Sequence, residues 1–403
     1  MSNDTTRPPW NTIILLATLA FASTFSTAVV FPNIGSFVRD RFVLSDTAAS
    51  LFAVSYLVPH VIFAFVWGAW SDRVGKRKPF LIGGYAATAV FHFLLPFAPT
   101  YPWLLLLRVA EGATSVLGFS LVMTIAADLA RGGHRGKVMG LMGGAVSLGT
   151  SLAFPVGGAL GVHSMLLLCG MGAAILLLCA AVAWRWLPEG SLGRARSLRD
   201  ALAVARDYPA LALPYAFTFI DRFTVGFFAV TFPLYASSVF GMDASASGRV
   251  LAGFLLPFSL LTFVFGRMTD RIGPMLLLLG GSLVYGVFVT FTGYLGQEHL
   301  LYLMIVLGVL AAAMYAPTLW MVAAWAPAER KASAMGGFNA AGSVGFSLGP
   351  LVGGVVADLA GYAEAFIVAG VSEVLIVLVA LPVLYRMGAL RHARIAVTRE
   401  QTS

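Results

Sequence analysis

The sequence predicts an all-α membrane protein with twelve transmembrane helices in two pseudo-symmetric six-helix bundles. The first observation behind this prediction is composition: 59% of the residues are apolar and only 11% are charged. Soluble globular domains have roughly 45–50% and about 25%. A soluble core cannot bury so much apolar surface, so we expect the excess to face lipid. The second observation is an internal repeat that divides the chain into two similar halves.

Twelve apolar runs are long enough to cross a bilayer, for which a helix needs about 20 residues. We place them at 11–37, 47–70, 79–98, 102–127, 137–160, 164–187, 210–239, 247–269, 274–296, 299–326, 332–357 and 364–386. An open sheet is excluded because lipid offers its edge strands no hydrogen-bond partners. The first run contains Ala20-Phe21-Ala22, which imitates a signal-peptide cleavage site. It continues to Val38, however, and we interpret it as an uncleaved first helix.

The longest polar break in the chain lies between the sixth and seventh apolar runs. We therefore predict an N-terminal six-helix bundle at 1–187, a linker at 188–209, a C-terminal six-helix bundle at 210–387 and a tail at 388–403. The sequence repeat supports this division. The matched segments are GAWSDRVG at Gly68–Gly75 with GRMTDRIG at Gly266–Gly273, 198 residues later; VVFPNI at Val29–Ile34 with VTFPLY at Val230–Tyr235, 201 later; and Gly157-Gly158 with Gly353-Gly354, 196 later. Parallel repeats of this kind place a substrate site between the halves, near the membrane midplane.

The net charge of +8 reflects membrane orientation. Of the 26 Lys and Arg residues, Arg39, Arg41 and Arg249 lie on one side of the predicted helices, and Arg108 and Arg222 lie inside helices. The others lie on the side of the linker and the two termini. By the positive-inside rule this side is the cytoplasm. We expect a multi-pass protein of the plasma membrane, which is the inner membrane of a Gram-negative bacterium, with the lipid bilayer and no nucleic acid as its partner.

The turn after the second predicted helix contains a dense set of glycines and charges. Gly75 permits a positive φ, Gly68 allows two helices to approach closely, and Asp72 is placed to accept hydrogen bonds from a helix end or a basic neighbour. This turn resembles the loop between helices 2 and 3 of the major facilitator superfamily, and the resemblance covers essentially the whole chain. It implies that family's fold and a conformational switch in transport. The residues assigned to the switch are Gly68, Asp72, Arg73, Gly75, Lys76, Arg77, Asp270, Arg271, Gly349 and Pro350.

A second motif lies in the fourth predicted helix. Leu104, Arg108 and Gly112 resemble the exporters' motif Leu-x-x-x-Arg-x-x-Gln-Gly, with Glu111 in place of Gln. The resemblance implies a cavity-facing Arg that takes part in proton coupling. The drug:proton antiporters also carry Gly-Pro-x-x-Gly-Gly in helix 5. Here that motif is incomplete in helix 5 and complete at Gly349–Gly354, so the chain resembles the twelve-helix drug:proton antiporters with this departure.

Charged residues at membrane depth cost roughly 2.5–3.5 kcal/mol each and therefore suggest function. They are Arg108, Glu111, Asp221, Arg222 and Glu373. In the repeat, the partners of the first four are Met304, Leu307, Ala20 and Phe21, so the scaffold does not require charges there. For Arg108 and Glu111 the alternative is mutual neutralisation, since they lie one helical turn apart. We interpret Glu373 as structural, satisfied by Ser372 or by a neighbouring helix.

Asp221 is the predicted proton carrier. It lies about 12 residues after Pro209, hence roughly 18 Å into its helix and near the midplane. We expect Arg108 to be its switching partner, because Arg222 is fixed beside Asp221 on a different face of the helix. Glu111 is the rival carrier.

Helices 7 and 10 supply aromatic and sulfur-containing side chains that suit hydrophobic ligands. The predicted substrate-binding residues are Phe217, Phe228, Met314, Tyr315, Trp320 and Met321. The same side chains are also ordinary helix-packing material.

His60, His92 and His163 have no metal-ligand spacing, and we interpret them as interfacial or hydrogen-bonded residues. Cys169 and Cys179 point apart on one helix and cannot form a disulfide with each other. We expect no metal and no cofactor.

These observations predict a secondary transporter that binds a small-molecule substrate and protons, works as a monomer and is not an enzyme. The chain has neither a nucleotide-binding loop for primary transport nor a nucleophile–base set. The first hypothesis is a proton-coupled exporter of hydrophobic or amphiphilic small molecules that works by alternating access. The alternatives are a metabolite carrier, either a proton symporter or a uniporter, and a membrane sensor that binds a ligand and signals to a partner.

Overall fold

The computed structural model describes residues 9–74, 76–129, 135–187, 204, 206–327 and 330–386. Within these residues, twelve apolar helices are long enough to cross a membrane, which confirms the predicted fold class. They are α1 (Trp10–Ala28), α2 (Asp46–Val74), α3 (Lys78–Leu94), α4 (Tyr101–Leu129), α5 (Arg135–Gly161), α6 (Met165–Trp186), α8 (Ala212–Phe240), α9 (Ala244–Ile272), α10 (Pro274–Phe291), α11 (Gln297–Trp325), α12 (Lys331–Leu359) and α13 (Tyr362–Arg386). The predicted tail at 388–403 and residues 188–203 and 205 of the predicted linker lie outside the described residues.

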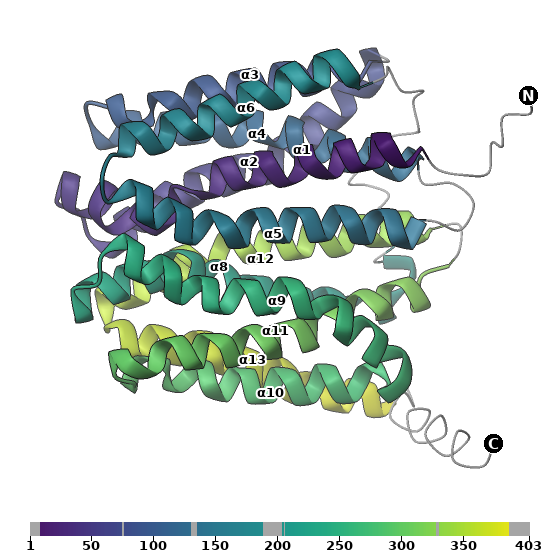
Figure 1. The fold of residues 1–403 in the computed structure, drawn as a ribbon. Helices are drawn as coiled ribbons and strands as arrows, with labels where there is room; N and C mark the ends of the chain where they lie inside the picture. Colours follow the sequence, from purple (N-terminus) through teal and green to yellow (C-terminus); the bar gives the residue numbers. More distant parts are fainter. Residues whose placement is uncertain are drawn as a thin grey trace, which may run out of the picture. The chain divides into compact units, whose positions relative to one another are not determined.

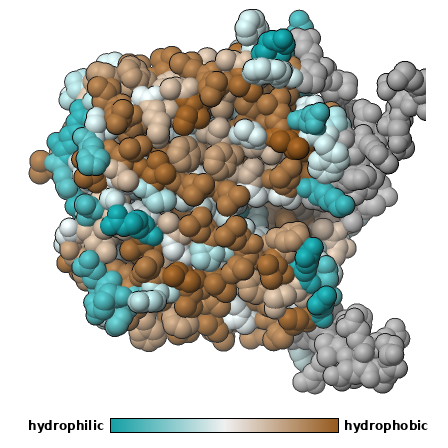
Figure 2. Space-filling view, in the orientation of Figure 1, coloured by the Kyte–Doolittle hydropathy of each residue, from teal (hydrophilic) through white to brown (hydrophobic). Residues whose placement is uncertain are grey.

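Large apolar side chains stand on the outer surface of these helices. Leu178 and Val379 are each 62% exposed, and Leu276 is 69% exposed. Figure 2 shows apolar side chains over the middle of the helices' length and hydrophilic ones nearer the helix ends. This distribution is what a lipid environment requires, because the bilayer core solvates apolar groups and the polar ends remain with headgroups and water.

The first transmembrane segment departs from the continuous helix predicted at 11–37. Helix α1 ends at Ala28, and the chain continues as a short 3₁₀ turn (η1, Phe31–Asn33) and a π-helical turn (η2, Ile34–Asp40). Pro32 has no backbone N–H to continue the α-helical hydrogen bonds, which explains the change of helix type. The side chain of Asn33 ties this segment to α5 by donating from Nδ2 to the carbonyl oxygen of Gly157 at 2.9 Å.

The chain divides into two compact units. The first comprises Met1–Ser197 and Phe232–Ala252, and the second comprises Leu198–Thr231 and Gly253–Ser403. In the first unit α3 packs against α4 and α6, and in the second unit α10 packs in the same way against α11 and α13 (Figure 1). The domain limits given by the sequence remain predictions, and the end of α8 with the start of α9 clusters with the first unit; the packing of α3, α4 and α6 nevertheless recurs in α10, α11 and α13.

Close helix contacts repeat between the two units as well. A Cβ added at any of four glycines would overlap a carbonyl oxygen of a neighbouring helix, so only glycine allows these approaches. The pairs are Gly112 with Tyr56 and Gly149 with Phe21 in the first unit, and Gly308 with Phe254 and Gly345 with Phe219 in the second. Gly112 and Gly308 differ by 196 positions, so Met304 and Leu307 are indeed the equivalents of Arg108 and Glu111.

The same contacts correct the alignment of α1 with α8. Phe21 and Phe219, which meet equivalent glycines, differ by 198 positions rather than the 201 taken from the Phe-Pro segments. At this level of the helix, Asp221 and Arg222 therefore correspond to Ser23 and Thr24, and not to Ala20 and Phe21. Pro32 follows Phe21 by 11 positions in the first unit, whereas Pro233 follows Phe219 by 14 in the second, so the two registers differ along the segment. The equivalents are still uncharged, so the charges of α8 are not a requirement of the repeat.

Candidate functional site

The first buried charge cluster lies in the first unit, on α4. Arg108 and Glu111 are fully buried and form an ion pair with 2.7 Å between Nη1 and Oε2. The guanidinium carbon of Arg108 also lies 4.3 Å from the ring centre of Phe52 and 4.4 Å from that of Tyr56, both on α2. The mutual neutralisation that the sequence left open therefore exists in the structure, and these aromatic faces add to the stabilisation of the buried cation.

His92 on α3 is a third member of this cluster. Its Nδ1 lies 2.7 Å from Oε1 of Glu111, so both carboxylate oxygens have a partner. Gly172 on α6 leaves room for the ring, since a Cβ there would lie 2.6 Å from Nε2 of His92. The sequence suggested a hydrogen bond for His92 but not its partner. A role of Arg108 and Glu111 in proton coupling remains a prediction.

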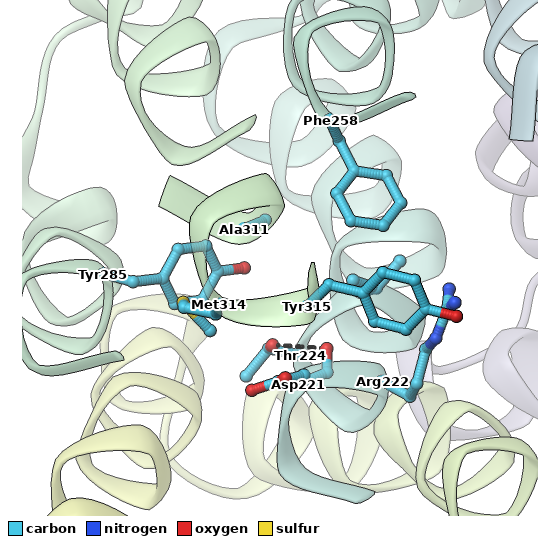
Figure 3. Close-up of a pocket in the computed structure, with 9 residues that line it drawn as sticks. Asp221, Arg222, Thr224, Phe258, Tyr285, Ala311, Met314 and Tyr315 are labelled. Atoms are coloured by element: carbon cyan, nitrogen blue, oxygen red, sulfur yellow. Dashed lines mark hydrogen bonds between the residues drawn. The ribbon is translucent and has the colours of Figure 1, made fainter. Parts of the chain in front are cut away.

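The second cluster surrounds a pocket inside the second unit. Figure 3 shows this pocket, which is lined by Asp221, Arg222, Thr224, Val225, Phe258, Tyr285, Ala311, Met314 and Tyr315. Four of the residues singled out in the sequence, from α8 and α11, thus meet at one place: Asp221, Arg222, Met314 and Tyr315. Asp221 is only 6% exposed, and neither of its carboxylate oxygens has a hydrogen-bond partner among the described residues.

Arg222 and Asp221 point to opposite sides of α8 (Figure 3). The guanidinium carbon of Arg222 lies 4.5 Å from the ring centre of Tyr315 and 5.9 Å from that of Phe258. Adjacent positions on a helix are about 100° apart, which is the reason that the two charges do not pair with each other. The pocket therefore presents a carboxyl group on one side and a cation held on an aromatic face on the other.

Glu373, for which the sequence predicts a structural role, lies beside the same cluster. The hydroxyl oxygen of Thr224 lies 2.9 Å from Oε1 of Glu373 and 2.9 Å from the backbone carbonyl oxygen of Asp221. A residue of a neighbouring helix thus provides a hydrogen-bond partner for Oε1 of Glu373, which is one of the two possibilities predicted from the sequence. Ser372 does not, since its hydroxyl donates to the carbonyl oxygen of Ala369 on its own helix.

The other predicted substrate-binding residues lie outside the pocket lining. Phe217 and Met321 are fully buried, and Phe228 packs with Phe254 at 5.8 Å between ring centres. Trp320 is partly exposed and donates from Nε1 to Oδ1 of Asp270 at 3.0 Å. Their assignment to substrate binding remains a prediction.

The predicted conformational switch is only partly described. Gly75, the packing of Gly68 and the side chain of Asp72 lie outside the described residues, while Arg73, Lys76 and Arg271 are exposed. Gly273, the repeat equivalent of Gly75, has φ +90°, the backbone conformation that the glycine was predicted to permit. Gly349 and Pro350 are buried in α12.

Both turns are joined to the equivalent helix of their repeat. In the first unit Arg77, which follows the turn, forms an ion pair with Asp128 on α4. In the second unit Asp270, which precedes the turn, accepts the hydrogen bond of Trp320 on α11. Equivalent turns of the two repeats are thus connected to equivalent helices, by an ion pair in the first unit and by a hydrogen bond in the second.

Asp128→Asn is expected to destabilise the protein by roughly 1–3 kcal/mol, because it leaves the charge of Arg77, whose side chain is only 5% exposed, with a weaker partner. Thermal unfolding of the purified protein in detergent measures the effect. Asp207→Asn is the matched control, since Asp207 and its partner Arg330 are about half exposed and such pairs contribute about 0–1 kcal/mol. Equal shifts for the two variants would contradict a special role of the Arg77 contact.

The described residues contain no group of three or more His, Cys, Asp or Glu side chains that is placed to hold a metal ion. His60 instead bonds through Nδ1 to the hydroxyl of Ser115 at 3.0 Å. Cys169 and Cys179 are both free and buried.

Twelve apolar helices that form two similarly packed units, with ionisable side chains deep in the helices, define a class of protein, the polytopic membrane transporters. The sequence model described as Major Facilitator Superfamily matches residues 16–220 and 211–400. The chain belongs to the major facilitator superfamily. This match confirms the resemblance to that family shown by the sequence motifs in the turn at Gly68–Gly75 and in the fourth helix.

Its relatives transport different kinds of compound. Multidrug resistance protein 1 of Bacillus subtilis is 26% identical over 68% of this chain and 72% of that protein. A probable sulfoacetate transporter of Cupriavidus necator is 29% identical over 40% of this chain and only 36% of its own length. Among solved structures, the nucleoside transporter NupG has the same fold, with a TM-score of 0.74 at 16% identity over 92% of this chain and 99% of that one.

Proposed function

We propose that this transporter is a proton-coupled exporter of hydrophobic or amphiphilic small molecules, that it works by alternating access, and that Asp221 binds the coupled proton. The observation that carries the proposal is the state of Asp221. Its carboxyl group is buried, faces a pocket and has no hydrogen-bond partner among the described residues. A carboxyl group in such a place is a suitable proton carrier, because a change in its hydration or in its distance from a cation alters its protonation.

The walls of the pocket support the substrate class. Phe258, Tyr285, Met314 and Tyr315 surround Asp221 with aromatic and thioether surface. Such surface adapts to hydrophobic ligands of different shape. The likeness to Multidrug resistance protein 1 supports the same class.

A metabolite carrier is the second candidate, and Arg222 is the observation that favours it. Its guanidinium group lies in the pocket on the ring of Tyr315, and the described residues include no carboxylate within 4.0 Å of it. Guanidinium groups bind carboxylates and other oxyanions by paired hydrogen bonds. The likeness to a probable sulfoacetate transporter supports a small organic anion as substrate in this case.

The charge distribution indicates how the protein is oriented in its membrane. We infer a protein of the plasma membrane with both termini in the cytoplasm, because Lys and Arg are concentrated on the side of the termini. The monomeric state remains a prediction. A ligand-binding sensor without transport activity is the remaining alternative, and it predicts binding without flux.

Transport by the purified protein in liposomes under an imposed pH gradient tests the proposal. Three radiolabelled probes separate the candidates: tetraphenylphosphonium as a hydrophobic cation, sulfoacetate as a small anion and uridine as a nucleoside. We expect saturable, gradient-dependent movement of tetraphenylphosphonium and no movement of the other two. Movement of sulfoacetate or uridine alone would favour a metabolite carrier. Saturable binding of a probe without any flux would favour a sensor.

A further inference from the structure

Glu373 lies at a close approach of α13 to α10. Two glycines make this approach possible: a Cβ at Gly286 would lie 2.7 Å from the carbonyl oxygen of Gly370 and 3.0 Å from Cβ of Glu373. The Glu373 side chain is fully buried in the interior of the second unit. Its Oε1 lies 2.9 Å from the hydroxyl oxygen of Thr224, which lines the pocket that Asp221 faces. A second acid therefore lies behind the pocket that Asp221 faces.

The hydrogen bonds around Thr224 restrict the form of this acid. A threonine hydroxyl has one proton to donate, and the Thr224 oxygen lies 2.9 Å from two acceptors, the carbonyl oxygen of Asp221 and Oε1 of Glu373. With an ionised Glu373 both acceptors compete for that proton. With a neutral Glu373, the carboxyl O–H of Glu373 donates to the hydroxyl oxygen of Thr224. The Thr224 hydroxyl then donates to the backbone carbonyl oxygen of Asp221, so each proton forms one hydrogen bond. Only in the second case does each of the two 2.9 Å contacts of Thr224 have its own proton.

The charges around Glu373 agree with the neutral form. The described residues include no basic group within 4.0 Å of it, and its Oε2 has no hydrogen-bond partner. Among the charged or titratable groups on the helices around it, those that line the pocket are Asp221 and Arg222 on α8, Tyr285 on α10 and Tyr315 on α11. Helix α12 has no charged side chain between Ser333 and Ala357. Since Arg222 is turned to Tyr315, an ionised Glu373 would be a buried charge without a partner, which is costly.

We propose that Glu373 is a second proton-binding carboxyl of the Asp221 site, so that the loaded site holds two protons, one on each acid. Asp221 faces the pocket and exchanges its proton. Glu373 lies behind Thr224 and keeps its proton when Asp221 ionises, because two neighbouring carboxylates repel each other. The physiological use of this proton rests on the proposed coupling, but the protonation itself does not.

Infrared spectroscopy of the purified protein in lipid nanodiscs tests this proposal without any substrate. A protonated carboxylic acid has a C=O stretching band that a carboxylate lacks. We expect the wild type to show two such bands from buried acids. One disappears as the pH is raised and is absent from Asp221→Asn. The other persists and is absent from Glu373→Gln.

Two further variants make the assignment specific. Thr224→Val removes the acceptor of the Glu373 O–H, so the persistent band is expected to remain but to shift to higher frequency. Glu364→Gln is the matched control, because Glu364 is an exposed carboxyl group on the same helix, and it is expected to leave both bands unchanged.

A persistent band that survives in Glu373→Gln, or that is missing from the wild type, would overturn the proposal. If Glu373→Gln does not fold, Thr224→Val decides, since an unshifted band would also overturn it. Both bands present in a protein that shows no pH-gradient-driven transport would refute the proposed function and leave the two-proton site standing.

Discussion

Glu111→Leu is expected to lower the free energy of unfolding by about 3–5 kcal/mol, the usual cost of removing one partner of a buried ion pair. The variant leaves Arg108 fully buried without its carboxylate, and it removes the hydrogen-bond partner of His92. Thermal unfolding in detergent and the fraction of monodisperse protein after purification measure this loss.

The matched control for this prediction is the double variant Arg108→Met with Glu111→Leu. It removes both charges and keeps a similar side-chain volume, so it is expected to be more stable than Glu111→Leu alone. A double variant as unstable as the single variant would show that the pair contributes through packing rather than through its charges. A fully stable Glu111→Leu would contradict the importance of the pair altogether.

Asp221→Asn is expected to abolish pH-gradient-driven accumulation of substrate in liposomes. Asparagine has nearly the shape of aspartate but does not bind and release a proton, so substrate binding and exchange of substrate across the membrane are expected to survive. The measurement compares accumulation under a pH gradient with exchange of labelled for unlabelled substrate at equal pH.

Asp243→Asn is the control for this prediction. Asp243 accepts a hydrogen bond from the backbone N–H of Ala246 at the start of α9, a cap that asparagine also provides. This variant removes a carboxylate from the same repeat and is expected to transport normally. If Asp221→Asn still accumulates substrate against its gradient, the assignment of the proton to Asp221 is wrong and Glu111 becomes the next candidate.

The fold was largely predictable from the sequence because lipid imposes strong constraints. Long apolar runs predicted the twelve helices, and the repeated turn at Gly68–Gly75 and Gly266–Gly273 predicted two units of equal topology. The break of helix type after Ala28 was missed, although Pro32 was its signal. The register of α1 against α8 was also misplaced, because the Phe-Pro match does not account for the three additional residues between Phe219 and Pro233 in the second unit.

The candidate site was predictable only in part. Charges inside apolar helices identified the members of both clusters on α4 and α8, since no scaffold requirement explains them. Their partners on other helices depend on helix rotation and tilt, which periodicity does not specify. The contacts of His92 with Glu111 and of Glu373 with Thr224 are therefore visible only in the structure.

The most direct test of the central claim is the movement of protons driven by substrate in liposomes that contain a trapped pH-sensitive dye. With no imposed pH gradient, a gradient of the transported probe is expected to move protons in the opposite direction through the wild type, and to move none through Asp221→Asn although the probe still exchanges. Proton movement that is equal in the two proteins would contradict the account, because the coupled proton would then bind elsewhere.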